Sequence, residues 1–187
     1  TKYLDGQGRT LGGAILGRAS LVAETRFFAR HTGPALSPFN AWVLSKSIET
    51  LAVRMDRHCA NALALAQHFS GHPELEEVRY PFLPSHPQQA LARRQMRQGG
   101  GLVVLVLKGG GERAQRFLDA VELVSHSPNL GDTRTIVTHP TSTTHSKLTE
   151  EERRAVGIPP GLIRISVGLE QVDDVIGDVT RALERSR

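Results

Sequence analysis

The clearest hydrophobic pattern of the chain lies between positions 37 and 71. Apolar residues recur there at steps of three and four, as on one face of a helix. They are Phe39, Trp42, Val43, Ile48, Leu51, Met55, Cys59, Leu63 and Ala66. Ser37 is a natural N-cap, and Pro38 suits the first helical position. The pattern predicts one helix of about eight turns, which ends near Gly71 and bridges two layers or domains.

Uninterrupted apolar runs predict strands. Residues 102–107 (LVVLVL) lie between two glycine triplets and indicate a strand that is buried on both faces. Residues 11–16 predict another buried strand, and residues 162–167 a further strand. Shorter strands are expected around 77–80 and 135–139. The glycine triplets lack the Gly-Lys-Ser/Thr that completes a phosphate-binding loop, so we interpret them as turns.

Helices are expected between these strands. Residues 19–32 predict a helix that ends at Gly33, and residues 112–123 an amphipathic one. Thr149 and Glu152 form a capping box, and the last helix begins near Val172 with acidic residues in its first turn. Strands that alternate with helices indicate an α/β fold class. We place a domain boundary at the end of the long helix, which gives domains at 1–70 and 71–187.

Composition narrows the class of protein. Of the 187 residues, 39% are apolar and 22% are charged, which is typical of a globular chain. The single Cys59 cannot form an internal disulfide, and no Cys/His spacing resembles a zinc site, so we expect no metal and a cytoplasmic location. No apolar run reaches the roughly 18 to 20 residues of a membrane span. The net charge of +4 is dispersed, which favours small anionic metabolites over nucleic acid as partners.

Two charged residues suggest chemistry. Lys2 precedes a glycine-rich loop, and an unprotonated lysine amine can condense with an aldehyde, although an isolated lysine is typically a solvated surface residue. Arg164 is a charge inside an apolar strand, a position that is costly unless the guanidinium meets an anion. That anion is either a substrate carboxylate or an internal Asp or Glu. His139 and His145 are more typical of loop or core histidines than of ligands.

Three separated blocks resemble one enzyme family. Residues 1–6 read TKYLDG and are followed by Gly12 and Gly13, residues 138–145 read THPTSTTH, and residues 162–170 read LIRISVGLE. In order and spacing they resemble the cofactor-lysine motif, the His-Pro-Ala-Ser-x-Thr-His segment and the Leu-Ile-Arg-Leu-Ser-Val-Gly-Leu-Glu segment of the Cys/Met metabolism (trans-sulfuration) family of pyridoxal-phosphate enzymes. The resemblance extends from position 2 to position 170.

The resemblance implies a fold and a set of site residues. It implies an aspartate-aminotransferase-like (fold type I) enzyme, with residues 1–70 as the end of the large cofactor-binding domain and residues 71–187 as the smaller C-terminal α/β domain. Lys2 is then the residue that carries pyridoxal 5'-phosphate (PLP), and Thr1 helps to hold the phosphate. Arg164 binds the carboxylate of the amino-acid substrate, and Asn129 replaces a serine near it. The resemblance also implies a homotetramer.

Departures from the family pattern point to a branch. Residues 6–9 read GQGR in place of Gly-His-Ser-Asp, and residues 129–135 read NLGDTRT in place of Ser-Leu-Gly-Gly-x-Glu-Ser. Both resemble the sulfhydrylases, above all O-succinylhomoserine sulfhydrylase, which implies γ-replacement on an O-acylhomoserine by sulfide in methionine biosynthesis. The alternatives are a cystathionine γ-synthase or γ-lyase of the same family, or an inactive fragment that serves subunit association. Arg9 and Arg134 either receive the succinyl group or are solvated.

Other cofactor-binding features of the family lie upstream of its lysine. They are an aspartate for the pyridine nitrogen, a tyrosine stacked on the ring and a glycine-rich phosphate-binding backbone, and this chain contains none of them. The resemblance therefore implies a parent protein of roughly 400 residues, beyond the usual size of a single domain. We do not expect the 187-residue chain alone to bind the cofactor tightly.

Overall fold

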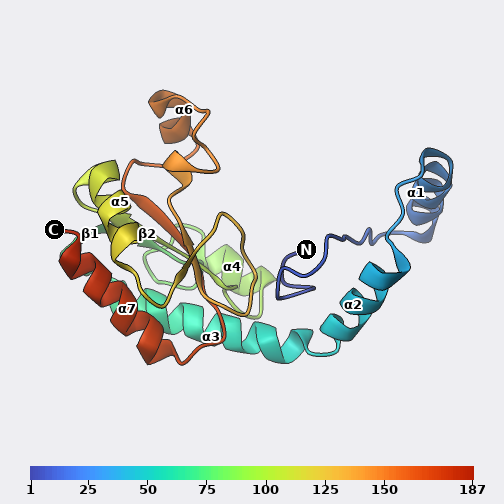
Figure 1. Cartoon of the computed structure of the whole chain (residues 1–187), viewed down its shortest axis with the longest axis horizontal. Helices are drawn as coiled ribbons and strands as arrows, with labels where there is room; N and C mark the ends of the chain where they lie inside the picture. The colour runs from blue at the N-terminus through green and yellow to red at the C-terminus, as the bar shows by residue number, and fades with distance from the viewer.

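The computed structural model describes all 187 residues and is built around a five-stranded sheet with the order β1-β2-β5-β4-β3 (Figure 1). The strands are β1 (Leu75–Arg79), β2 (Leu102–Leu107), β3 (Ser125–His126), β4 (Ile136–Thr138) and β5 (Leu162–Ser166). Neighbouring strands run antiparallel, except that β3 and β4 are parallel. The most apolar strand, β2, lies between β1 and the central strand β5, where neighbouring strands pair with both of its edges.

Three helices cover one face of this sheet. They are α3 (Leu51–Phe69), α5 (Gly110–Ala120) and α7 (Val172–Arg185), and each contacts a neighbouring helix of the set. The core lies between them and the strands, and its fully buried side chains include Leu65, Phe69, Val103, Leu105, Phe117, Ile163, Ile165 and Leu183. The predicted alternation of strands and helices agrees with this element order. The division at residue 70 stays a prediction.

Two helices form an arm that extends away from the sheet. The arm consists of α1 (Ala19–Thr32) and α2 (Pro38–Ile48), at the right of Figure 1. Gly33 ends α1 in the left-handed region with φ of 88°, as predicted. No residue of α1 is buried, and Phe27 and Phe28 are 68% and 65% exposed. The arm thus presents large apolar side chains at its surface.

The prediction of one long helix is wrong, because the helix breaks between α2 and α3. The carbonyl oxygen of Ser47 accepts from the backbone amide and the hydroxyl of Thr50, at 3.3 and 3.2 Å, and from the Arg54 guanidinium at 2.9 Å. Those bonds replace the hydrogen bond that a continuous helix makes to the amide of residue 51. Apolar spacing is the same on both sides of the break, so the hydrophobic pattern does not reveal it.

The prediction of a buried strand at residues 11–16 is also wrong. Leu11, Ile15 and Leu16 are 75%, 69% and 87% exposed, and the segment pairs with no strand of this chain. Its backbone hydrogen bonds go elsewhere, since Gly12 bonds through both its N–H and its carbonyl to the Thr1 hydroxyl. An apolar run becomes a strand only where a neighbouring strand can satisfy its backbone.

The remaining predictions hold with small shifts. The strand at 102–107, the strand predicted at 162–167, the short strands near 77–80 and 135–139, and the last helix are confirmed, with β5 ending at Ser166. The predicted burial of residues 102–107 on both faces is incomplete, because Leu102 is exposed and Val104 is partly exposed. Thr149 and Glu152 form the expected capping box of α6 (Glu150–Ala155). Helix α4 (Gln89–Gln95), strand β3 and the short 3-10 helix η1 (Pro140–Ser142) were not predicted. No helix combines the length and apolar character that a membrane crossing demands.

Candidate functional site

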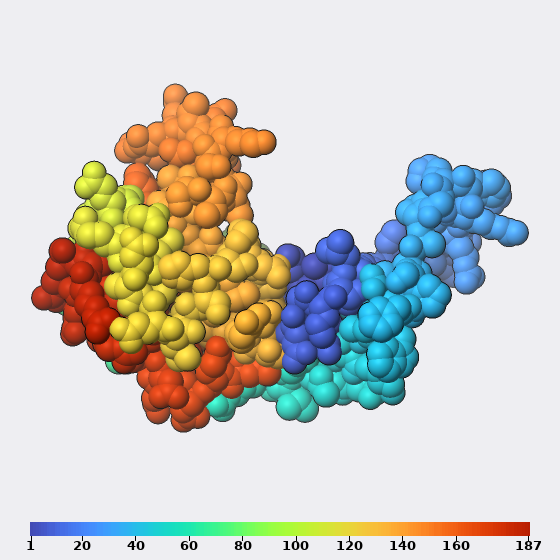
Figure 2. All heavy atoms as spheres, viewed as in Figure 1, coloured from blue at the N-terminus to red at the C-terminus, as the bar shows by residue number.

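The loop that carries Lys2 is fixed from two sides. Arg54 of α3 donates to the carbonyl oxygens of Tyr3 at 2.6 Å and Leu4 at 3.3 Å. From the other side, the amide of Thr133 donates to the carbonyl oxygen of Gly6 at 2.7 Å. In Figure 2 the N-terminal residues lie at the floor of a wide concavity between the protrusion that carries α6 and the arm. Lys2 is therefore held in a fixed loop, and its side chain is exposed.

Three of the four predicted site residues come together. The Lys2 amine donates to the side-chain oxygen of Asn129. The Arg164 guanidinium donates to the carbonyl oxygens of Pro128 at 2.7 Å and Asn129 at 2.9 Å. Residues 127 positions apart, Lys2 and Asn129, thus meet directly, and Arg164 joins them through the Asn129 backbone. We call Lys2, Asn129 and Arg164 the amine–guanidinium cluster.

Thr1 does not contact this cluster in the structure. Its hydroxyl donates to the carbonyl oxygen of Gly12 at 3.3 Å and accepts from the Gly12 amide at 3.1 Å. The hydroxyl therefore ties the start of the chain to the glycine pair of the first motif. Its role toward a phosphate stays a prediction.

The register of β5 explains where Arg164 points. Ile163 and Ile165 are fully buried in the core, and side chains alternate between the two faces of a strand. Arg164 therefore projects from the face that α3, α5 and α7 leave free. It pairs with Val104 of β2 and Thr138 of β4 in the ladder. The same alternation that builds the core thus presents a cation on the opposite face.

Arg164 has no acidic partner. None of the ion pairs in the chain includes it, and its Nε is buried without a hydrogen-bond partner. Burial lowers the pKa of Arg164 because the charged form loses solvation. The interpretation of Arg164 as half of an internal ion pair is therefore excluded within this chain. The guanidinium retains donors for an external anion.

The loop that holds Asn129 is anchored to the end of β5. The amide of Gly131 donates to the Ser166 hydroxyl at 2.9 Å, and Gly131 has a φ of 76°, which favours glycine. Farther along, the amide and the hydroxyl of Thr135 donate to the Glu170 carboxylate at 2.5 and 2.8 Å. Asn129 and Arg164 are consequently positioned by one strand and the loop bound to it.

Arg9 and Arg134 both have carboxylate partners. The Nε of Arg9 lies 3.1 Å from Asp5, and that of Arg134 lies 3.4 Å from Asp132. Burial alone would raise the pKa of Asp5, but the amide and the guanidinium of Arg9 together lower it. The Arg134 side chain is 71% exposed. These contacts favour the structural and solvated interpretations of the two arginines over a role in receiving a succinyl group.

The two histidines of the second motif make hydrogen bonds within and next to their own loop. His139 is buried, and its ring nitrogens lie 3.0 Å from the Ser142 hydroxyl and 2.7 Å from the carbonyl oxygen of Pro160. The Nδ1 of His145 lies 2.8 Å from the Thr144 hydroxyl. No group of three or more His, Cys, Asp or Glu side chains is placed to hold a metal ion.

Sequence reasoning missed a polar stripe on α3 that supports the site. The stripe consists of Arg54, His58 and Asn61, all buried. The Nδ1–H of His58 donates to the carbonyl oxygen of Val167 at 2.6 Å, and Asn61 donates to those of Gly168 and Glu170 at 3.0 and 2.9 Å. Their spacing of four and three residues was a readable signal, because it places polar residues on one side of an otherwise apolar helix.

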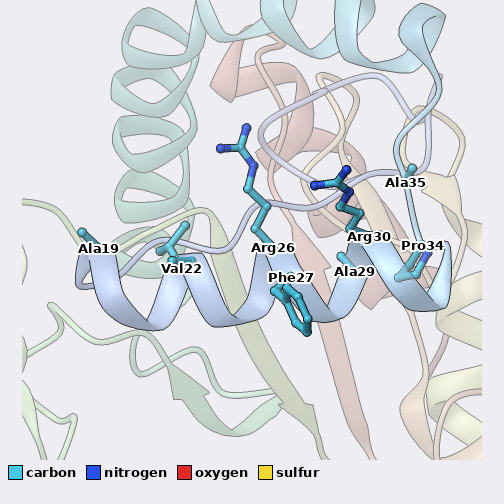
Figure 3. Close-up of a pocket in the computed structure, with 9 residues that line it drawn as sticks. Ala19, Val22, Arg26, Phe27, Ala29, Arg30, Pro34 and Ala35 are labelled. Atoms are coloured by element: carbon cyan, nitrogen blue, oxygen red, sulfur yellow. The ribbon is translucent and has the colours of Figure 1, made fainter.

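The largest hollow lies elsewhere, against α1. Figure 3 shows Arg26 and Arg30 projecting from one side of that helix and Phe27 from another. The lining residues belong to α1 or follow it closely, and none belongs to the amine–guanidinium cluster. This hollow is therefore separate from the functional site.

Comparison with known proteins agrees with the geometry. The family described as Cys/Met metabolism PLP-dependent enzymes matches residues 1–184. The chain belongs to this family. It is 50% identical over 98% of its length to the O-succinylhomoserine sulfhydrylase of Pseudomonas aeruginosa, of which it covers 45%. It is also 46% identical over its whole length to the L-methionine gamma-lyase of Pseudomonas putida, of which it covers 47%.

Solved structures of the family share the fold. The cystathionine gamma synthase of Xanthomonas oryzae pv. oryzae, in complex with aminoacrylate and cysteine, superposes with a TM-score of 0.94 and 34% identity. The match covers 99% of this chain and 48% of that one. The predicted α/β fold type I and the PLP-dependent family are thus confirmed. The chain spans about half the length of the curated relatives it matches.

Proposed function

We propose that the protein containing this chain carries out PLP-dependent γ-replacement on an O-acylhomoserine, with O-succinylhomoserine and sulfide as substrates and homocysteine and succinate as products. The amine–guanidinium cluster is the observation that carries the proposal, because an amine and an unpaired guanidinium meet at one asparagine. Identity of 50% to sulfhydrylases of two bacterial genera supports this branch of the family.

The residues present suit the cofactor. Lys2 makes no ion pair, and its amine contacts the side-chain oxygen of Asn129. PLP, when bound, supplies an aldehyde for such an amine and an electron-withdrawing ring. We assign the cofactor linkage to Lys2 and a phosphate contact to Thr1. The Lys2 amine would also move protons at the substrate carbons.

The substrate carboxylate is assigned to Arg164 and Asn129. Two backbone carbonyls hold the guanidinium plane, while its Nε is buried and unpaired. The Asn129 side chain accepts from Lys2 through its oxygen, which leaves its amide hydrogens available as donors. A carboxylate bound here lies next to the Lys2 amine, so the bonds that break at the neighbouring carbon are held in a fixed orientation.

Each of the two proposed domains supplies a different part of the site. Residues 1–70 supply Lys2 and Thr1, and residues 71–187 supply Asn129 and Arg164. Helix α3 joins the parts, since Arg54 binds the Lys2 loop while His58 and Asn61 bind the chain after β5. One rigid helix thus connects the amine to the carboxylate-binding residues.

Product analysis on the intact protein tests the proposal. The protein with PLP receives O-succinylhomoserine together with sulfide, O-succinylhomoserine together with cysteine, or methionine alone. We expect homocysteine from the first mixture at the highest kcat/KM. A thioether formed only with cysteine indicates a cystathionine γ-synthase. Ammonia released only from methionine indicates a γ-lyase, the activity named for the relative from Pseudomonas putida.

A further inference from the structure

The ring of Tyr3 is partly buried and packs against residues from three distant parts of the chain. A Cβ added at Gly101 would lie 2.7 Å from the Tyr3 hydroxyl, and one added at Gly131 would lie 3.1 Å from Cγ of the same ring. The His58 ring meets it edge-on, with ring centroids 5.3 Å apart and an interplanar angle of 81°. Two of these neighbours lack side chains, and Tyr3 occupies the space that they leave.

The glycines around the Tyr3 ring also contact the chain near Lys2 and near Arg164. On one side, a Cβ at Gly131 would also lie 3.1 Å from the carbonyl carbon of Lys2, so this glycine lies directly against the Lys2 backbone. On the other side, the carbonyl oxygen of Gly101 accepts from Val167 at 2.8 Å, just beyond β5. The ring therefore stands between the backbone of the amine and the strand of the guanidinium.

We propose that Tyr3 is a positioning residue that acts as a spacer, setting the separation between the Lys2 amine and the Arg164 guanidinium through the volume of its ring. The proposal rests on the proposed function, because this separation matters only if both groups serve one substrate. A reacting group that is misplaced by about 1 Å costs up to about 100-fold in rate. A change in this separation should therefore lower the reaction rate by much more than the loss of the Tyr3 contacts alone would suggest.

We expect the Tyr3 hydroxyl to be dispensable for this role. It is buried and makes no hydrogen bond of ordinary geometry, although the Ser166 side chain lies near it, so the ring is positioned mainly by packing. It is also the atom nearest to a Cβ at Gly101, at 2.7 Å, whereas the next contacts are Cβ of His58 and Cε1 of Tyr3, both at 3.4 Å. An alanine at position 101 therefore displaces a tyrosine ring, and a phenylalanine ring at position 3 leaves room for it.

Four variants of the intact protein test this relation. They are G101A, Y3F, the double variant Y3F/G101A, and G177A as the matched control. Gly101 and Gly177 both lack a positive φ, so alanine suits either backbone. At Gly177 of α7 the nearest atom is the flexible end of Arg181, at 3.4 Å. The control thus repeats the substitution at a position away from Tyr3.

Two readouts separate the spacer from the proposed reaction. The first is the rate at which trinitrobenzenesulfonate modifies the Lys2 amine in cofactor-free protein, followed by peptide mass spectrometry. The second is the pair kcat and KM with O-succinylhomoserine and sulfide. We expect G101A to change the labelling rate severalfold and to lower kcat by about tenfold, with KM within about threefold of the parent. Y3F, Y3F/G101A and G177A stay within about twofold in both readouts.

The decisive result is the relief of G101A by Y3F. A G101A protein that matches G177A in labelling and kcat overturns the proposal, and so does a defect that Y3F leaves in place. If G101A does not fold, Tyr3→Ala serves instead, because it opens a space where G101A closes one. Tyr3→Ala is expected to speed Lys2 labelling and lower kcat, and equal behaviour of Tyr3→Ala and Tyr3→Phe counts against the spacer.

Failure of the spacer and failure of the proposed function give different results. Reductive trapping of PLP on Lys2 reports the function alone, and trinitrobenzenesulfonate labelling reports the position of Lys2 without cofactor or turnover. Normal trapping with a silent G101A overturns the spacer only. Absent trapping with the expected labelling pattern overturns the proposed function and supports the packing relation.

Discussion

The Arg164 guanidinium combines three properties that seldom occur together on a structural arginine. It lies on a strand whose neighbouring residues are fully buried, it makes no ion pair, and its Nε has no hydrogen-bond partner. Its bonds go to two backbone carbonyls, which orient the group without neutralising it. A cation prepared in this way is suited to a carboxylate that arrives from outside the chain.

Replacement of Arg164 by lysine tests this role. We expect R164K to raise KM for the amino-acid substrate by about 10- to 100-fold, because an ammonium keeps the charge but loses the planar, two-pronged donor geometry. The matched control is R134K at an arginine that is 71% exposed, which should stay within about twofold. Steady-state kinetics of the intact protein give both values. An unchanged KM in R164K removes Arg164 from the carboxylate site.

His58 gives a prediction about pH. Burial lowers the pKa of His58, and the nearby Arg54 lowers it further, against the opposing effects of the Val167 carbonyl, Glu170 and Asp132. The unfolded chain therefore binds more protons than the folded one just below pH 6.5, so this contribution to stability is present above pH 6.5 and is lost as pH falls toward the folded pKa.

The variant H58Q isolates that titration. At about pH 7.5 we expect it to be less stable than the parent by about 1 to 3 kcal/mol, because the bond to Val167 is weakened in a buried place. At about pH 5.5 the difference should shrink, since only the parent loses stability by protonation at position 58. Urea unfolding at both pH values measures this. A difference that stays constant or grows on acidification contradicts the assignment.

Among the elements, α7 stabilises the sheet through one carboxylate. Asp178 is fully buried and accepts from the amides of Glu122, Leu123 and Val124 at 3.0, 3.0 and 3.1 Å. These three amides follow α5 directly and would otherwise be unsatisfied at the turn into β3. Arg181 lies 3.1 Å from the same side chain.

The substitution D178N should destabilise the protein by about 2 to 4 kcal/mol, because an amide group presents hydrogens to amides that need an acceptor. D173N, at an exposed position in the first turn of α7, is the control and should cost about 0.5 kcal/mol. Denaturant unfolding of the intact variants gives the free energies. Equal stability of D178N and D173N refutes the assignment of Asp178 as the acceptor for this turn.

Among the helices and strands, the elements that were predicted correctly are those encoded by local sequence patterns. The strands β2 and β5, the helices α1 and α7 and the capping box of α6 were predicted because each depends on residues close in the sequence. The break at Ser47 depends on Arg54 reaching back along the helix, and the exposure of residues 11–16 depends on the absence of a paired strand. Short elements such as α4 and β3 have too few residues for a pattern.

The site was predictable to a similar extent. Lys2, Asn129 and Arg164 were selected from motifs as candidate site residues, and the structure brings them together, while their roles stay predictions. The roles of Tyr3, His58 and the two enclosing glycines were not predicted, because these contacts join segments that are tens of residues apart. A single sequence does not show which glycine packs against which aromatic ring.

At the scale of the whole molecule, two features stand out: the exposed arm, and the greater length of the relatives that the chain matches. The arm exposes Phe27, Phe28, Phe39 and Trp42, each at least 60% exposed, and the chain spans about half the length of its relatives. We expect the 187-residue chain to bind PLP more weakly than the intact protein by about 100-fold or more. Titration followed by the visible absorbance of bound PLP compares the two, and equal dissociation constants contradict this expectation.

The linkage between Lys2 and the cofactor is the central claim, and borohydride reduction of the intact protein with PLP tests it most directly. After proteolysis, mass spectrometry is expected to find the pyridoxyl group on Lys2, with Lys46, Lys108 and Lys147 unmodified and no label in a Lys2→Arg variant. A label on any other lysine, or an unlabelled Lys2 in protein that has bound PLP, would contradict the claim.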